Sequence, residues 1–536
     1  MQPSTANQIT TPGGPEQEAS SCRSDRIVIT FYHIIYLSVL YISNEKGENT
    51  PLQQALWQNQ ALSGIAWKSR LAVSFTHGVA SGDVTATSAV VWTRVDREAS
   101  LQVEVSTDPN FRATALTRTA AATAATDFTV KVVAEPLDSA RLYYYRFTDG
   151  EATSDTGSFR TAPLRNVSAP VRFVFTGDSD GTRVNGQPAY NQFEVLDAAR
   201  RENPDFFIYL GDTVYADSDR RPAPARTLDE YRALYKENRE YPALRGLLQA
   251  VSTYAIWDDH EVHNDFDGQT VDRALFAAGR RAFLEYMPLQ DFPFPDRASC
   301  AADPLFRLFR WGSDIDLIIL DERSCRSADA EHACSGDPAP ALSPLLRLAV
   351  NVPPSPPPGC LDALRDPSRT LLGGFQKLVF KSVLLYSKAK FKFVINEVPI
   401  QQIYGFPYDR WEGYAAERDE ILRFIRDHNI GNVIFLTTDL HANFLGKVVL
   451  DRLANPVPVA DEFVAGPIAT RTFQREIQGI FPVSPDDYRR IFEIVGVECA
   501  DPDTYGYGLV EVQGGAATIS LKNDRGEVLC RKTIGP

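Results

Sequence analysis

The sequence predicts an α/β (α+β) protein in which a small β-sandwich precedes a larger domain of strands and helices. Short runs that alternate apolar and polar residues, such as LQVEVS and FTVKVV, fill residues 74–165 and are separated by Asp, Gly, Ser and Pro. From residue 166 to residue 536 the pattern changes to apolar runs separated by amphipathic stretches such as AAERDEILRFIRDHN. Strands that alternate with helices form a largely parallel or mixed sheet covered by helices on both faces.

Residues 1–73 form a leader with no sustained hydrophobic period, and its first part has the polar composition of a disordered segment. Within it, residues 27–43 are apolar, but they are fewer than the roughly 20 residues that a membrane-spanning helix needs. The segment fits a signal anchor, because Arg23 and Arg26 precede it, and it equally fits a strand or core segment, because it is rich in β-branched and aromatic residues. Membrane anchoring therefore stays open.

The composition narrows the class of partner. A formal net charge of -14 over 536 residues argues against a nucleic-acid partner, because phosphate backbones are bound by clustered Lys and Arg. No nucleic-acid-binding module is recognised, and we expect a monomer.

Residues 296–371 are predicted to be an insertion that folds over the surface, since they contain the proline run NVPPSPPPGC. The insertion also holds four of the seven cysteines, Cys300, Cys325, Cys334 and Cys360. Disulfides and free thiols are both compatible with this spacing. The C-terminal residues return to alternation, which predicts a closing hairpin or meander.

Carboxylates end five apolar runs of the larger domain: VRFVFTGDSD, FFIYLGD, TYAIWDDHE, FKFVINE and NVIFLTTDLH. A single Asp after a strand usually caps the following helix. Five together indicate a site, because ligands of open α/β sheets bind beyond the carboxyl ends of the strands. Crowded carboxylates repel one another unless cations neutralise them, so we expect a metal centre.

The spacing within these runs supports the same expectation. Asp178 and Asp180 are two residues apart, as are Asp439 and His441, so in extended backbone the members of each pair face the same way. Asp212 and Tyr215 are three residues apart, which would place both on one face of a first helical turn.

The candidate ligands are mostly carboxylates, with an amide or two and a phenol, and this set without sulfur disfavours a zinc-thiolate site. The prediction is a binuclear centre of Fe3+ with Ca2+, while Mn2+ or Zn2+ could also fill it. Two adjacent cations would activate a water molecule and hold a phosphoryl group for in-line displacement.

Three motifs in register, Gly211-Asp212-x-x-Tyr215, Trp257-Asp258-Asp259-His260-Glu261-x-x-Asn264 and Asp439-x-His441, resemble the alkaline phosphatase D (PhoD-like) family of metallophosphoesterases. The likeness covers roughly residues 75–530 and includes GVASGDVTATSAVVWTRV, LDERSCRS, LLGGFQK and YDRWEGY. It implies a fibronectin type III-like β-sandwich before a calcineurin-like αββα sandwich. It also implies hydrolysis of phosphomonoesters or phosphodiesters by a metal-bound hydroxide, with Fe3+ and Ca2+ as the metals, and a secreted, periplasmic or cell-envelope location.

By motif position, the resemblance implies that Asp212 bridges the two metals and that Tyr215 holds the iron. Asp259 would take the place of the family's usual amide ligand, and His260 would orient the phosphate or protonate the leaving group. The sequence departs from the family pattern at Asp178, where many relatives carry Cys, and at Thr438, where the usual residue is Gly.

The remaining candidates each have a structural alternative. Asn264 could contact substrate or metal, or cap a turn. Arg323 and Arg326 could clamp phosphate oxygens, or pair with nearby carboxylates. Asn396 or Glu397 could complete the metal shell, or serve packing alone. A different class of function, a catalytically weak or inactive metal-binding scaffold of the same fold, also remains compatible with the altered motifs.

Overall fold

The computed structural model describes residues 72–290, 305–349, 352–478 and 496–535. The chain divides into two compact units, residues 1–70 and residues 71–536, and the description that follows concerns the second. The predicted leader with its apolar segment 27–43 therefore lies outside the described residues, except for its last two positions. None of the described helices is both long and apolar enough to cross a lipid bilayer.

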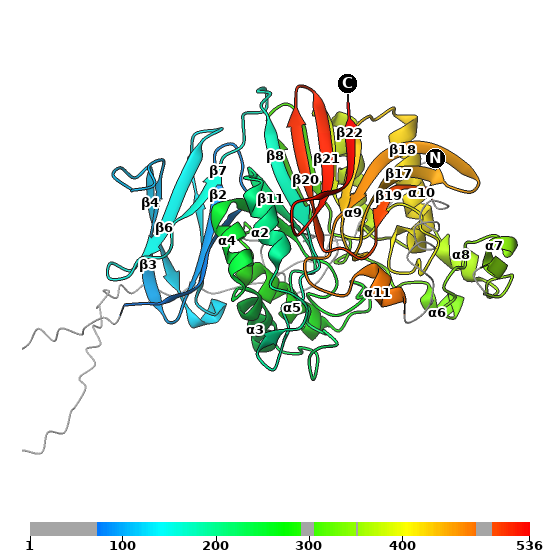
Figure 1. Cartoon of the computed structure of the whole chain (residues 1–536), viewed down its shortest axis with the longest axis horizontal. Coiled ribbons are helices and arrows are strands. Elements are labelled where there is room, and N and C mark those ends of the chain that lie inside the picture. The colour runs from blue at the N-terminus through cyan, green and yellow to red at the C-terminus, as the bar shows by residue number, and fades with distance from the viewer. Residues whose placement is uncertain (1–71, 291–304, 350–351, 479–495, 536) are drawn as a thin grey trace, which may run out of the picture. The chain divides into compact units, whose positions relative to one another are not determined.

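The larger of the two main sheets has nine strands (Figure 1). Four central strands run parallel to one another, and a C-terminal antiparallel meander closes one side. In spatial order the strands are β22 (Val528–Ile534), β21 (Ala516–Asn523), β20 (Gly506–Gln513), β8 (Val171–Thr176), β11 (Phe206–Leu210), β12 (Ser252–Ile256), β1 (Phe75–Gly82), β2 (Ala89–Val95) and β5 (Thr129–Ala134). The meander is the closing element that the alternating C-terminal pattern predicts.

The N-terminal β-sandwich shares this sheet. Its second sheet is separate and contains β4 (Leu116–Ala122), β3 (Ala99–Ser106), β6 (Leu142–Thr148) and β7 (Gly157–Arg160). Its first sheet continues into the larger domain, because β1 pairs in parallel with β12 and aligns Gly82 with Thr253. A Cβ atom on Gly82 would lie 2.5 Å from the Thr253 carbonyl oxygen, so this close approach requires glycine.

A partly buried ion-pair cluster also joins the sandwich to two helices of the larger domain, α3 (Leu228–Asn238) and α5 (Arg273–Tyr286). The carboxylate of Asp127 lies 2.9 Å from Arg94 and 3.0 Å from Lys236, and it accepts a hydrogen bond from Tyr286. Burial opposes ionisation of this group, but these partners hold the pKa of Asp127 at about 2. The cluster therefore stabilises the contact only while Asp127 is ionised.

The second main sheet has seven strands, and the three pairings between its four central strands are all parallel. In spatial order the strands are β13 (Arg307–Trp311), β14 (Ile315–Ile319), β15 (Phe391–Ile395), β16 (Val433–Thr437), β18 (Asn455–Val464), β17 (Asn443–Asp451) and β19 (Val497–Asp501). Its inner face packs against the first sheet, where the ring centroids of Phe173 and Phe393 are 5.2 Å apart. A disulfide between Cys499 and Cys530 links β19 of this sheet to β22 of the other.

Helices cover the outer faces of the two sheets and complete an αββα arrangement (Figure 1). On the first sheet these are α2 (Glu194–Arg201), α3, α4 (Pro242–Ala250) and α5, and on the second α9 (Gly373–Tyr386) and α10 (Ala415–Asp427). A short helix, α11 (Phe473–Ile477), lies near the carboxyl ends of the strands. Helix α3 begins at a capping box, in which Thr227 and Glu230 satisfy each other's backbone N–H groups.

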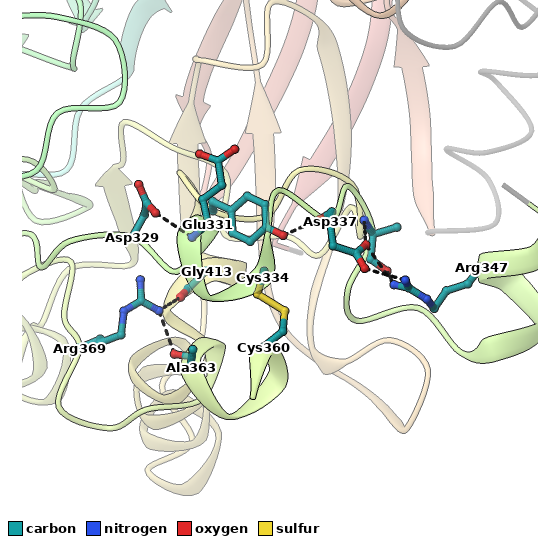
Figure 2. The surroundings of a disulfide bond; sticks show 11 residues. Asp329, Glu331, Cys334, Asp337, Arg347, Cys360, Ala363, Arg369 and Gly413 are labelled. Carbon is teal, nitrogen blue, oxygen red and sulfur yellow. Dashed lines mark hydrogen bonds and ion pairs between the residues drawn. A yellow bond between two sulfur atoms is a disulfide. The ribbon is translucent and has the colours of Figure 1, made fainter. Parts of the chain in front are cut away.

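The predicted insertion at 296–371 was too broad. Residues 307–319 form β13 and β14 of the second sheet: β14 is buried along its whole length and pairs with β15, and the partly exposed β13 pairs with β14 at the edge of the sheet. The irregular part that does leave the sheet carries three short helices, α6 (Glu331–Cys334), α7 (Pro344–Ala349) and α8 (Cys360–Leu364). A disulfide between Cys334 and Cys360 ties α6 to α8 (Figure 2).

Candidate metal centre and catalytic site

The carboxylates predicted to meet at the strand ends do converge. Ligand atoms of Asp178, Asp212 and His441 all lie within 4.8 Å of one another, and so do those of Asp212, Asp259 and His260. These residues follow β8, β11, β12 and β16 from both sheets. Asp212 belongs to both groups, which is the arrangement that two adjacent cations sharing one carboxylate would need.

The backbone that produces this convergence differs from the predicted one. Asp178 (φ 61°), Asp212 (φ 47°), Asp439 (φ 66°) and His441 (φ 50°) are all left-handed, so neither extended backbone nor a helical turn orients them. Each chain segment turns sharply as it leaves its strand. Such conformations cost free energy for residues other than glycine and are typical of functional sites.

Asp178 is fully buried and accepts hydrogen bonds from the Thr438 hydroxyl at 2.6 Å and from the Asp439 backbone N–H at 3.2 Å. Burial raises the pKa of Asp178 above its ordinary value. The two positions that depart from the family pattern therefore touch each other. The hydroxyl of Thr438 supplies a donor that the glycine expected there would lack.

Mutual repulsion among the carboxylates is strong. Burial, together with the neighbouring Asp259, Asp258 and Glu261, raises the pKa of Asp212 well above its ordinary value, although His260 opposes this. Burial and the same aspartates raise the pKa of Asp439 in the same way. Bound cations would remove this repulsion, so the donor set fits a metal centre.

Tyr215 lies against both histidines of the site. Its Oη is 3.2 Å from Nε2 of His441, and its ring stacks on His260 with centroids 4.2 Å apart. Burial raises the pKa of the Tyr215 phenol well above its ordinary value, and the neighbouring Asp212 and Asp178 raise it further. Only a strongly acidic cation would therefore bind it as phenolate.

His260 is held by a residue that the sequence reasoning missed. Its Nδ1 lies 2.5 Å from Oδ1 of Asp217, and the other oxygen of Asp217 accepts the backbone N–H of Asn264 at 2.6 Å. Burial alone would lower the pKa of His260, but Asp259, Asp212 and Asp217 raise it well above its ordinary value. The Asp217 carboxylate thus fixes the orientation of the imidazole through Nδ1.

Two predicted metal ligands lie outside both three-residue groups. Asp180 lines the adjacent cavity, and its oxygens accept hydrogen bonds from the Ser218 hydroxyl at 2.5 Å and from the Thr182 backbone at 3.0 Å. The backbone N–H of Asp439 donates a hydrogen bond to the Asp178 carboxylate.

The two arginines predicted to clamp phosphate are engaged elsewhere. Arg323 is fully buried and binds Asp258 at 2.5 Å and both oxygens of Asp409 at 2.7 Å. Arg326 binds Asp409 at 2.6 Å and the Tyr414 hydroxyl at 2.9 Å. They join the turn after β12 to the loop around Asp409, and these contacts are the pairing with carboxylates that the sequence also allowed.

Asn396 and Glu397 also lie apart from the candidate ligands. The amide of Asn396 accepts from Trp411 at 3.0 Å and donates to the Val398 carbonyl at 2.5 Å. Glu397 is buried beside Glu322, and burial followed by that neighbour raises the pKa of Glu397 well above its ordinary value. Both residues fit the packing role.

A cavity of about 280 Å3 opens beside the two groups. Its wall includes Tyr215, His260, His441, Asp217 and Asn264. The Asn264 side chain is exposed and donates to Asp265 at 2.8 Å. The volume exceeds that of a phosphate group, so the cavity can hold a phosphoryl group and part of what it is attached to.

Comparison with known proteins agrees with the sequence motifs. The model of the PhoD-like phosphatases matches residues 184–521, and the model of the PhoD-like phosphatase N-terminal domain matches residues 60–163. The chain belongs to the PhoD-like phosphatase family. Alkaline phosphatase D of Bacillus subtilis (strain 168) is 28% identical over 418 residues, which are 70% of this chain and 66% of that protein.

Two solved structures share the fold of this PhoD-like protein. A structure of PhoD superposes with a TM-score of 0.70 at 23% identity, covering 86% of this chain and 89% of that one. Purple acid phosphatase PPD1 from yellow lupin (Lupinus luteus) superposes with a TM-score of 0.54 at 12% identity, covering 85% of this chain and 73% of the other. The expected fold, an αββα sandwich preceded by a β-sandwich, is therefore confirmed.

Proposed function

We propose that this PhoD-like protein is a metal-dependent phosphoric ester hydrolase that acts on phosphomonoesters, phosphodiesters or both. The observation that carries the proposal is the shared carboxylate of Asp212, which belongs to both groups of candidate ligands. Family membership and the cavity beside these groups support it.

One cation would be held by Asp178, Asp212 and His441 with Tyr215 beside them, and a second by Asp212 and Asp259. When bound, the cations supply positive charge that polarises the phosphoryl oxygens and lowers the pKa of water. Fe3+ next to Tyr215 and Ca2+ at the carboxylate-rich position fit these donors best, with Mn2+ or Zn2+ as replacements. A purified sample should then show the visible charge-transfer absorbance of a phenolate on ferric iron.

Proton transfer is the task of the chain's own residues. His260 donates the proton from Nε2 to the departing alcohol oxygen, and the Asp217 carboxylate holds Nδ1–H so that the ring keeps one orientation. The ring of Tyr215 packs on the imidazole and excludes water from that face.

The location is proposed on separate grounds. The disulfides Cys334–Cys360 and Cys499–Cys530 fit an oxidising compartment, so we infer that the protein works outside the cytoplasm, either secreted, in a periplasm or at the cell envelope. Fractionation of the producing cells would test this.

The test of the function is hydrolysis of p-nitrophenyl phosphate and of bis(p-nitrophenyl) phosphate by the purified protein, before and after removal of metal by a chelator. Hydrolysis of at least one ester that disappears on chelation and returns with added metal supports the proposal. Stable metal occupancy without hydrolysis of either ester would favour the inactive scaffold instead.

A further inference from the structure

The cavity wall contains an ion pair in addition to the candidate metal ligands. Three residues that line the cavity, Tyr190, Asp219 and Arg471, belong to neither group of candidate metal ligands. A guanidinium nitrogen of Arg471 pairs with the Asp219 carboxylate, and Nε of Arg220 lies 3.4 Å from the same carboxylate. The Arg220 guanidinium also lies over the ring of Tyr190, 5.4 Å from its centroid. Two guanidinium groups therefore share the Asp219 carboxylate, and Arg471 is the one that also lines the cavity, whose described lining includes the further acids Asp180, Asp217 and Glu476.

Arg471 is placed by a segment that is fixed to the candidate metal centre. The backbone N–H of Ala469 donates to the Asp178 carbonyl at 2.9 Å, and the Ala469 carbonyl accepts from Asp180 at 2.7 Å. The Asn191 side chain also donates to the Ile468 carbonyl at 2.8 Å. The backbone next to Arg471 is thus fixed relative to Asp178, while the Arg471 side chain is 43% exposed.

The guanidinium of Arg471 can exchange its carboxylate partner for another anion. Its carboxylate partner Asp219 is 51% exposed, and ion pairs between exposed groups contribute little to stability. Glu476, another acid of the cavity wall, pairs with Nδ1 of His441 at 3.2 Å. A ligand anion could therefore replace Asp219 on the guanidinium at small cost, and the planar guanidinium can bind two oxygens at once.

We propose that Arg471, with Tyr190 beside it, forms a subsite for a second anionic group on the substrate, beyond the phosphate that is cleaved. The inference rests on the proposed phosphoric ester hydrolysis and narrows its substrate class. Substrates of this class are phosphate esters whose alcohol carries a carboxylate or a second phosphate group. Asp219 occupies the guanidinium when the subsite is empty.

The test compares two isosteric substrates, 4-carboxyphenyl phosphate and 4-carbamoylphenyl phosphate, which differ by one remote negative charge. The metal-loaded enzyme should show a KM about threefold to tenfold lower for the carboxylate than for the carboxamide, because a partly exposed charge pair has that strength, and kcat should be similar for the two. Arg471→Gln should abolish the preference, and Asp219→Asn should increase it. Arg423→Gln is the matched control, because Arg423 is an exposed arginine paired with Asp419 on α10 and is not part of the cavity wall.

The outcomes separate the subsite from the proposed function. Equal KM values for the two substrates in the unmodified enzyme, or a preference that survives Arg471→Gln, would overturn the subsite while leaving hydrolysis intact. Failure to hydrolyse either substrate, or any other phosphate ester, would overturn the proposed function itself. A similar loss of preference in Arg423→Gln would also reject the subsite, since the effect would then follow from overall charge.

Discussion

Replacing Asp217 by Asn should weaken proton donation by His260 more than any other property of the site. Asp217 accepts two hydrogen bonds, from Nδ1–H of His260 and from the backbone N–H of Asn264. An amide has a single acceptor oxygen, so Asp217→Asn leaves one of these donors facing an NH2 group.

The size of the effect follows from these contacts. A hydrogen bond to a charged group contributes about 1.5–3 kcal/mol, so its loss should lower kcat by about 10- to 150-fold for esters whose alcohol needs a proton to leave. Esters with good leaving groups need no proton, and their kcat should change little.

The assay is a series of phosphate esters from 2,4-dinitrophenyl phosphate to alkyl phosphates, measured at saturating substrate and equal metal content. The dependence of log kcat on the pKa of the alcohol should be shallow for the unmodified enzyme and steep for Asp217→Asn. Asp197→Asn, a surface carboxylate on α2 that pairs with Arg200, is the control for the same chemical change. An equal loss of kcat along the whole series, or no loss at all, would refute the role given to Asp217.

Three further predictions concern stability. Replacing Arg323 by Gln leaves the buried carboxylate of Asp258 without its cation, while Asp409 keeps Arg326. The free energy of unfolding in urea should therefore fall by about 3–5 kcal/mol, whereas the surface change Arg423→Gln should alter it by less than about 0.5 kcal/mol; equal effects would contradict the bracing role. Replacing Cys334 and Cys360 by Ser opens a 26-residue loop, and in the chain-entropy account this removes about 3 kcal/mol of stabilisation. Limited proteolysis should therefore cut within this region first. An unchanged cleavage pattern would contradict a stabilising role for the disulfide. The pKa of Asp127 is lowered to about 2, so the contribution of its ion pairs to stability is present above about pH 4 and disappears as the pH falls toward 2. Asp127→Asn should therefore lower the free energy of unfolding by about 1 kcal/mol at pH 7, after allowing for solvent screening, and by almost nothing at pH 2. An equal loss at both pH values would refute the ion-pair origin.

The sequence was sufficient to predict the layers and the meeting point of the site. Apolar runs separated by amphipathic segments define parallel strands, and parallel strands bring their carboxyl ends to one edge. Asp178, Asp212, Asp259 and His441 all follow such runs, and their spacing and the family motifs point to the same residues. The positions depend on strand order and not on any fine detail of the turns.

The features that local patterns could not reveal are contacts between distant residues. The pairing of Arg323 with Asp409 joins positions 86 residues apart, and the choice among several nearby acids is made by packing. Asp217 lies two residues after Tyr215, but no periodicity distinguishes it from a solvated carboxylate. The left-handed backbone at Asp178 and Asp439 was missed because tight turns override the geometry of the strands they follow.

The sequence pattern does not predict the strands β13 and β14, for a different reason. Its apolar runs are short, and the cysteine- and proline-rich residues around it dominate the composition of that part of the chain. Likewise, the continuity of the sandwich with the larger sheet depends on Gly82. A glycine followed by an Asp is typical of a turn, so the sequence does not predict that this strand pairs with the larger sheet.

The central claim is that Asp212 is shared by two cations, and the most direct measurement is the metal content of the purified protein alongside that of Asp212→Asn. The account predicts about two metal ions per chain in the unmodified protein, and loss of at least one of them together with hydrolysis in the variant. Two retained ions in Asp212→Asn, or full hydrolysis by a preparation free of metal, would contradict it.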